Sequence, residues 1–129
     1  TIIKYENKDI TIDIPEKVYL DGRKNLIQRC FNNLIDNSIK YSENIFITLK
    51  KSSNNILITI DDDGPGIPED ERENVFKPFY KIDKSRSDSK SSVGLGLSIA
   101  SDIIRSHGGN IELETSPSNG LRTKIFLPF

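Results

Sequence analysis

The chain has 129 residues, a length that fits one domain with a real hydrophobic core. Its 18 Lys and Arg nearly balance its 19 Asp and Glu, and the resulting formal charge of -1 excludes the basic field of a dedicated nucleic-acid binder. The single cysteine excludes an internal disulfide, and no run approaches the roughly 18 apolar residues of a membrane-spanning helix.

In the N-terminal half, a strand pattern comes before a long helix pattern. Ile10–Ile14 alternates cleanly and predicts a strand, with residues 1–5 as a candidate hairpin partner. Residues 23–41 carry apolar side chains at helical spacing, and Asp21 before them is a candidate N-cap. A second hairpin is expected from two β-branched runs, 45–50 and 56–60.

The C-terminal half opens with a glycine- and proline-rich break at 61–68, after which 69–75 has room for one or two helical turns. Residues 85–92 have almost nothing to bury and predict a mobile loop. A helix over 95–106 and strands at 111–115 and 122–127 complete the chain. The elements predict an α+β two-layer sandwich, in which a mixed, mostly antiparallel sheet of about five strands is covered on one face by about three helices.

Three polar residues line one flank of the first predicted helix. Asn33, Asn37 and Lys40 fall at i, i+4 and i+7, beside the apolar stripe rather than opposite it. An Asn oxygen can ligate Mg²⁺ and a Lys can meet a phosphate, so these residues are suited to edge a pocket. A solvated helix face explains the same pattern, since Asn and Lys are common on such faces.

The strand at 56–60 runs directly into three aspartates. Period two places Asp62 on the same face as Ile58 and Ile60, so it ends the core face as a carboxylate that needs a donor such as an exocyclic amine. Gly64 and Gly66 then allow the backbone to approach a ligand closely. A plain turn is the alternative, and it suffices for Asp61 and Asp63 as solvated residues.

The second predicted helix is preceded by glycines. Gly94 and Gly96 would expose the free N–H groups of its first turn, which is a ready anion site, although a flexible hinge accounts for them as well. The only histidine, His107, stands at the C-terminus of this helix. That position indicates a capping or charge–dipole role rather than catalysis.

In order and spacing, these segments resemble the motifs of bacterial two-component sensor histidine kinases. Residues 33–41 resemble the N box, and the G1, F and G2 boxes and the final Gly-Thr element are matched by 62–67, 75–81, 94–99 and 120–123. The resemblance spans essentially the whole chain. It implies the Bergerat fold shared with gyrase, mismatch-repair and chaperone ATPases, as one ATP-binding domain over 1–129 with a mobile ATP lid at about 76–93.

The resemblance also implies a role for individual residues. Asn37 would ligate Mg²⁺, with Asn33 assisting directly or through water, and Lys40 would contact phosphate. Asp62 would accept from the adenine amino group, supported by Thr123 through a water. Lys81, which replaces the usual lid arginine, is assigned with Asn33 to catalysis. The other residues expected to contact ATP are Tyr41, Gly64, Gly66, Ile67, Phe76, Gly94, Leu95, Gly96 and Leu97.

The function implied by the resemblance is transfer of the γ-phosphate of Mg-ATP to a histidine on a separate dimerisation hairpin. The partners would be that hairpin and, through the full-length kinase, a response regulator. Because the chain begins at Thr1 and has no Met, we expect it to be a fragment, monomeric without the hairpin, from the cytoplasmic part of a membrane-anchored kinase.

Other functions of the same fold remain open at this point. The alternatives are an ATPase, an anti-sigma-type serine kinase, and a degenerate nucleotide-binding docking domain. ATPases of this fold carry a Glu general base where this chain has Asn33, a neutral amide that cannot take a proton. Ser91-Ser92-Val93 stand where the family commonly has glycines, which affects the expected phosphate contacts.

Overall fold

The chain folds around one six-stranded sheet, described by a computed structural model over residues 2–5, 8–13, 23–77 and 93–128. The strands are β1 (Ile2–Tyr5), β2 (Lys8–Asp13), β3 (Asn44–Lys51), β4 (Asn55–Asp62), β5 (Asn110–Thr115) and β6 (Leu121–Pro128). Their order is β1-β2-β3-β4-β6-β5, and every neighbouring pair is antiparallel except β2 with β3. The mixed, mostly antiparallel sheet is confirmed, with six strands rather than about five because β1 also pairs.

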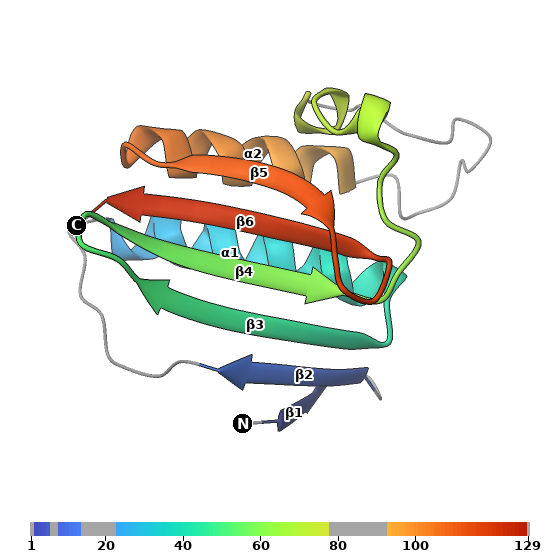
Figure 1. The fold of residues 1–129 in the computed structure, drawn as a ribbon. Coiled ribbons are helices and arrows are strands. Elements are labelled where there is room, and N and C mark those ends of the chain that lie inside the picture. Colours follow the sequence, from blue (N-terminus) through green and yellow to red (C-terminus); the bar gives the residue numbers. More distant parts are fainter. Residues whose placement is uncertain (1, 6–7, 14–22, 78–92, 129) are drawn as a thin grey trace.

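Two α-helices, α1 (Lys24–Tyr41) and α2 (Val93–Ser106), cover one face of this sheet and pack against each other (Figure 1). The helical turns expected at 69–75 form as two short 3₁₀ segments, η1 (Glu69–Glu71) and η2 (Asn74–Phe76), and η2 contacts α2. The two-layer α+β sandwich is therefore confirmed. In the described part of the chain, no helix is long and apolar enough to cross a membrane.

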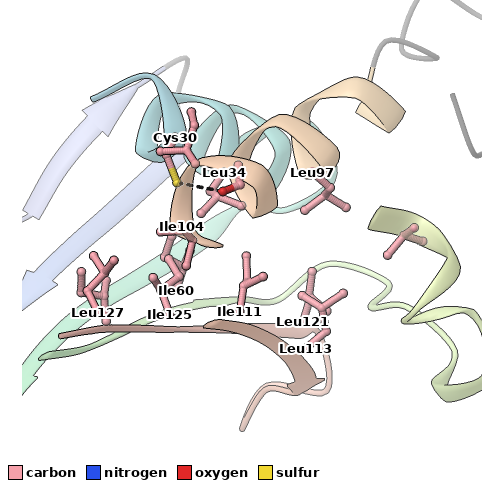
Figure 2. Packing of buried hydrophobic residues seen from close by; sticks show 14 of the residues in the cluster. Cys30, Leu34, Ile60, Leu97, Ile104, Ile111, Leu113, Leu121, Ile125 and Leu127 are labelled. Atoms are coloured by element: carbon pink, nitrogen blue, oxygen red, sulfur yellow. Dashed lines mark hydrogen bonds between the residues drawn. The ribbon is translucent and has the colours of Figure 1, made fainter. Parts of the chain in front are cut away.

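The core lies between the helices and the sheet, and it follows from the alternation of the strands (Figure 2). In β6, Leu121, Thr123, Ile125 and Leu127 are buried, whereas Arg122, Lys124 and Phe126, which alternate with them, are half-buried. Ile56, Ile58 and Ile60 of β4 point to the same side, since Ile58 lies opposite Ile125 and Ile60 opposite Thr123. Burial of apolar surface at about 25 cal/mol per Å² is the main force holding the layers together.

Cys30 belongs to this core and joins the two helices. Its Sγ lies 3.7 Å from the main-chain oxygen of Ala100 in α2, the contact drawn as a dashed line in Figure 2. Burial raises the pKa of the thiol to about 12, so the neutral form persists at physiological pH. Cys30 therefore packs as a small apolar residue rather than acting as a reactive nucleophile.

The N-terminus of α1 is held by the histidine at the far end of α2. His107 Nδ1 lies 2.8 Å from the oxygen of Ile103, and Nε2 accepts from the N–H of Arg23 at 3.0 Å. The expected capping role of His107 is thus confirmed, and it extends to α1. The expectation of Asp21 as N-cap is wrong, because Arg23 occupies that position and Asp21 lies outside the described residues.

Candidate functional site

The motif segments converge at one end of the sandwich. The C-terminal ends of α1 and β4, the β5–β6 turn and the N-terminal end of α2 all lie together at the right of Figure 1. This places Asn37, Lys40 and Asp62 at the same end as the first turn of α2. Antiparallel pairing is the reason, since β4 and the β5–β6 turn meet where Asp61 lies opposite Arg122.

Two buried amide atoms in α1 have no partner among the described residues, Nδ2 of Asn33 and Oδ1 of Asn37. Such atoms normally find hydrogen bonds, and leaving one buried and unpaired costs about 1–3 kcal/mol. The free oxygen of Asn37 suits a hard cation, which takes oxygen ligands. The free N–H of Asn33 suits a phosphate oxygen or a water. The pair therefore fits Mg²⁺ and a polyphosphate, and does not behave as a solvated helix face.

Asp62 is the carboxylate that the alternation of β4 turns inward, and it is only 5% exposed. Its Oδ1 accepts from the N–H groups of Gly64 and Leu121, each at 3.0 Å, and the hydroxyl of Ser38 in α1 also bonds to it. Both backbone donors are on Oδ1, so Oδ2 is the oxygen that the backbone leaves for a ligand. The inward direction expected for Asp62 agrees with this burial.

Burial raises the pKa of Asp62 above its ordinary value of 3.8, and the nearby Asp63 carboxylate adds to the rise. The hydrogen bonds from Leu121, Gly64 and Ser38 act in the opposite direction and leave a net increase. The folded state therefore binds this proton more tightly than the unfolded chain does. Asp62 alone makes the ligand-free domain less stable as pH rises from 3.8 through its folded pKa.

We expect Asp62→Asn to remove this pH-dependent contribution to the folding stability. Compared with the parent, the ligand-free variant gains stability on going from pH 4 to pH 7, and urea denaturation across roughly that range measures the difference. Asp63→Asn is the matched control of opposite sign. Hydrogen bonds from Asn44 and Glu43 lower the pKa of Asp63, outweighing its burial, so its contribution is present above 3.8 and lost as pH falls. Parallel pH profiles for parent and Asp62→Asn would contradict this assignment.

The expectation of a solvated turn residue is wrong for Asp61, whereas Asp63 is half-exposed but also has partners in the protein. Asp61 is buried on the open face of the sheet and forms a bidentate pair with Arg122, at 2.7 and 2.9 Å. Asp63 accepts from the N–H groups of Glu43 and Asn44, and from the side chain of Asn44 at 2.8 Å. Asp63 therefore ties the segment after α1 to the segment after β4.

The segment after β4 passes close to the β5–β6 turn. Gly66 has a φ of +73°, and a Cβ there would lie 3.3 Å from the oxygen of Gly120, so both conformation and space favour glycine. Gly64 contributes its N–H to Asp62. Ile67 and Phe76 are half-buried and pack on the core. All four expected site residues of this segment thus lie within or beside the end of the sandwich that carries Asp62.

Helix α2 begins at Val93, two residues before the predicted start. Gly94, Leu95 and Gly96 therefore form its first turn, where N–H groups have no partner within the helix. Leu97 is buried in the core at 3% exposure, which leaves its backbone rather than its side chain for a ligand. The proposed anion site at this helix end is compatible with the fold.

Several expected site residues receive less support. Lys81 and most of the lid at 76–93 lie outside the described residues, and the side chain of Tyr41 is not described. Thr123 is buried in β6 opposite Ile60, and no direct hydrogen bond joins it to Asp62, whose described partners are Leu121, Gly64 and Ser38. Support of Asp62 by Thr123 through a water stays a prediction.

Ser38 and Ser116 also bond to Asp62, and neither is among the site residues expected from the sequence. Ser38 is buried in α1, and a hydroxyl on a buried helix face is itself a signal of a polar partner. Ser116 precedes the predicted turn, and nothing local ties it to β4. Among the described residues, no cluster of three or more His, Cys, Asp or Glu could hold a metal ion.

Known proteins resemble this chain in sequence and in fold. Residues 22–129 match the family described as histidine kinase-, DNA gyrase B- and HSP90-like ATPase. The chain is 37% identical over 123 residues to the sensor histidine kinase CpxA of Escherichia coli, covering 94% of this chain and 27% of CpxA. It is 35% identical to the sensor-like histidine kinase SenX3 of Mycolicibacterium smegmatis, over 92% of this chain and 32% of SenX3.

A solved structure shows the same fold. The ATP binding domain of PrrB from Mycobacterium tuberculosis superimposes with a TM-score of 0.79 at 28% identity, covering 96% of this chain and 82% of that one. The curated relatives are much longer, since the chain spans about a third of their length or less. The likeness therefore concerns one domain-sized part of those proteins.

Proposed function

We propose that this chain, which belongs to the histidine kinase-, DNA gyrase B- and HSP90-like ATPase family, binds Mg-ATP and provides the phosphoryl donor site of a protein-histidine kinase. The observation that supports this most is the pairing, at one end of the sandwich, of an inward carboxylate with an unpartnered buried amide oxygen. Asp62 and Asn37 supply these two groups. The first recognises an adenine amino group and the second a metal ion on the phosphates.

Different residues of the site bind the base, the metal ion and the phosphates of the nucleotide. Asp62 holds the base through Oδ2, because its other oxygen is occupied by backbone N–H groups. Asn37 Oδ1 ligates Mg²⁺, and Asn33 donates to a phosphate oxygen. Bound Mg²⁺ neutralises charge on the phosphates. Lys40 and the first turn of α2 orient the phosphates, while Tyr41, Gly64, Gly66, Ile67 and Phe76 border the nucleotide.

Phosphoryl transfer requires chiefly positioning and charge neutralisation. The acceptor in this proposal is a neutral imidazole of a separate dimerisation hairpin, which forms a bond to the γ-phosphorus as the bond to the bridging oxygen of ADP breaks. Lys81 assists at the γ-phosphate as a point charge. The phosphoryl group then passes to a response regulator. In this proposal the domain belongs to the cytoplasmic part of a membrane-anchored kinase. Residues at about 76–93 form its ATP lid.

An ATPase of the same fold is the second candidate, and the chemistry of Asn33 argues against it. Its neutral amide cannot accept a proton from water, which a hydrolytic general base must do. The unpartnered atom of Asn33 is moreover an N–H donor. Slow hydrolysis in the isolated domain, with rapid transfer once a histidine hairpin is supplied, is the outcome that separates the kinase from the ATPase.

Calorimetric titration of ATP and GTP in the presence of Mg²⁺ tests the site. We expect the parent to prefer ATP, and Asp62→Asn to lose about tenfold or more of its ATP affinity because an amide oxygen accepts more weakly than a carboxylate and its NH₂ opposes the adenine amine. GTP affinity does not fall, because the NH₂ of Asn can donate to O6 of guanine. Equal affinity of the parent for both nucleotides would remove the adenine role of Asp62.

A further inference from the structure

The turn between β5 and β6 is bound to the end of β4 by one buried hydroxyl. Ser116, only 4% exposed, donates from Oγ to the main-chain oxygen of Asp62 at 2.7 Å. The same Oγ accepts from the N–H of Gly120 at 2.9 Å. Ser116 therefore serves as donor and acceptor at once, and it links both sides of the turn to the residue that we assign to the base.

The backbone of this turn also contacts the carboxylate of Asp62. Leu121, at the start of β6, donates its N–H to Oδ1 at 3.0 Å. At Gly120, an added Cβ would fall 2.2 Å from the main-chain oxygen of Asp62 and 2.6 Å from its Oδ1. The turn thus packs on both the main chain and the side chain of Asp62, so a small displacement of the turn changes the direction of the carboxylate.

We infer that Ser116 is a positioning residue for base recognition. Its hydroxyl holds the β5–β6 turn against the end of β4. The turn, once held there, donates a hydrogen bond to Oδ1 of Asp62 and leaves Oδ2 directed to the nucleotide. The inference rests on the proposed function. Ser116 is added to the site because of its hydrogen bonds in the β5–β6 hairpin, and it lies outside every segment that resembles a kinase motif.

The alternative is that Ser116 only stabilises the hairpin. The two roles differ in which nucleotide they affect. A structural loss lowers the fraction of folded protein and weakens ATP and GTP binding in proportion. Misdirection of Asp62 weakens ATP binding alone, because guanine bound in the same pose would place O6, an acceptor, where adenine places its amino group. The ratio of the two affinities in fully folded protein therefore separates positioning from stability.

The test is calorimetric titration of ATP and GTP with Mg²⁺ on the parent, Ser116→Ala and Ser118→Ala, at a temperature where urea denaturation shows all three to be folded. Ser118 is the matched control, since it is exposed in the same turn. We expect Ser116→Ala to lose about tenfold in ATP affinity with GTP affinity unchanged, the size of one lost buried hydrogen bond, and Ser118→Ala to match the parent.

A folded Ser116→Ala with the ATP-to-GTP ratio of the parent overturns the positioning role. If Ser116→Ala does not fold, Ser116→Cys, which weakens both hydrogen bonds at nearly the same volume, takes its place: a reduced ATP-to-GTP ratio in the folded variant supports the inference, and the parental ratio refutes it. A parent that does not prefer ATP refutes the proposed function itself, which distinguishes that failure from failure of the inference.

Discussion

Replacing Asn37 by Ala is expected to lower the affinity for Mg-ATP by about 100-fold, because removing even a residue that only supports a metal ligand costs about 10–100-fold. The physical reason is that Oδ1 of Asn37 is buried and accepts no hydrogen bond from the described protein, so its only use is toward a ligand. Binding of ATP without Mg²⁺ changes far less. Calorimetric titration with Mg²⁺ and with EDTA measures the two affinities separately.

The same substitution should not destabilise the ligand-free fold. Removing an unpaired buried polar atom relieves a desolvation cost, so thermal unfolding of Asn37→Ala without nucleotide occurs at or above the parental temperature. Asn32→Ala is the matched control, because Asn32 is an exposed residue of the same helix and should alter neither quantity. Unchanged Mg-ATP affinity in Asn37→Ala would refute the metal assignment.

Gly120→Ala is expected to cost about 3 kcal/mol of folding stability and, in addition, the selectivity for ATP. A Cβ at this position would overlap the main-chain oxygen of Asp62 at 2.2 Å, a distance that backbone atoms cannot accept without moving apart. The displaced turn takes the N–H of Leu121 away from Oδ1 of Asp62. Urea denaturation measures the first effect and the ATP-to-GTP affinity ratio the second.

Gly109→Ala is a control with the same steric conflict at the opposite end of the β5–β6 hairpin. Its Cβ would lie 2.2 Å from the main-chain oxygen of Phe126, far along β6 from Asp62. We expect a similar loss of stability with the ATP-to-GTP ratio preserved. If both variants lose selectivity equally, or if neither does, the β5–β6 turn does not set the orientation of Asp62.

Much of the site could be predicted from the sequence because strand alternation and helical spacing depend only on residues close together in the chain. The alternation of β4 is sufficient to direct Asp62 inward, since the side chains of a strand point to opposite faces in turn. Helical spacing placed Asn33 and Asn37 on one flank of α1 in the same way. Neither conclusion needs knowledge of which strand pairs with which.

Hydrogen-bond partners from distant parts of the chain could not be predicted from the sequence. The prediction that Asp61 is solvated is wrong because strand pairing brings Arg122 to it, and strand pairing also supplies Asn44 as an unexpected partner of Asp63. Ser116 lies 54 residues from Asp62, and His107 lies 84 residues from Arg23. Polar groups at such separations in the sequence come into contact only in the folded chain, so no local sequence pattern predicts these hydrogen bonds.

The sequence by itself determined the helices, the strand alternation, the inward carboxylate and the order of the motif segments, because each depends on neighbours a few residues apart. The tertiary structure decided the parallel pairing of β2 with β3, the insertion of β6 between β4 and β5, and the contacts of the β5–β6 turn with Asp62. These depend on burying one apolar face across the whole sheet, a condition that only the complete chain can satisfy.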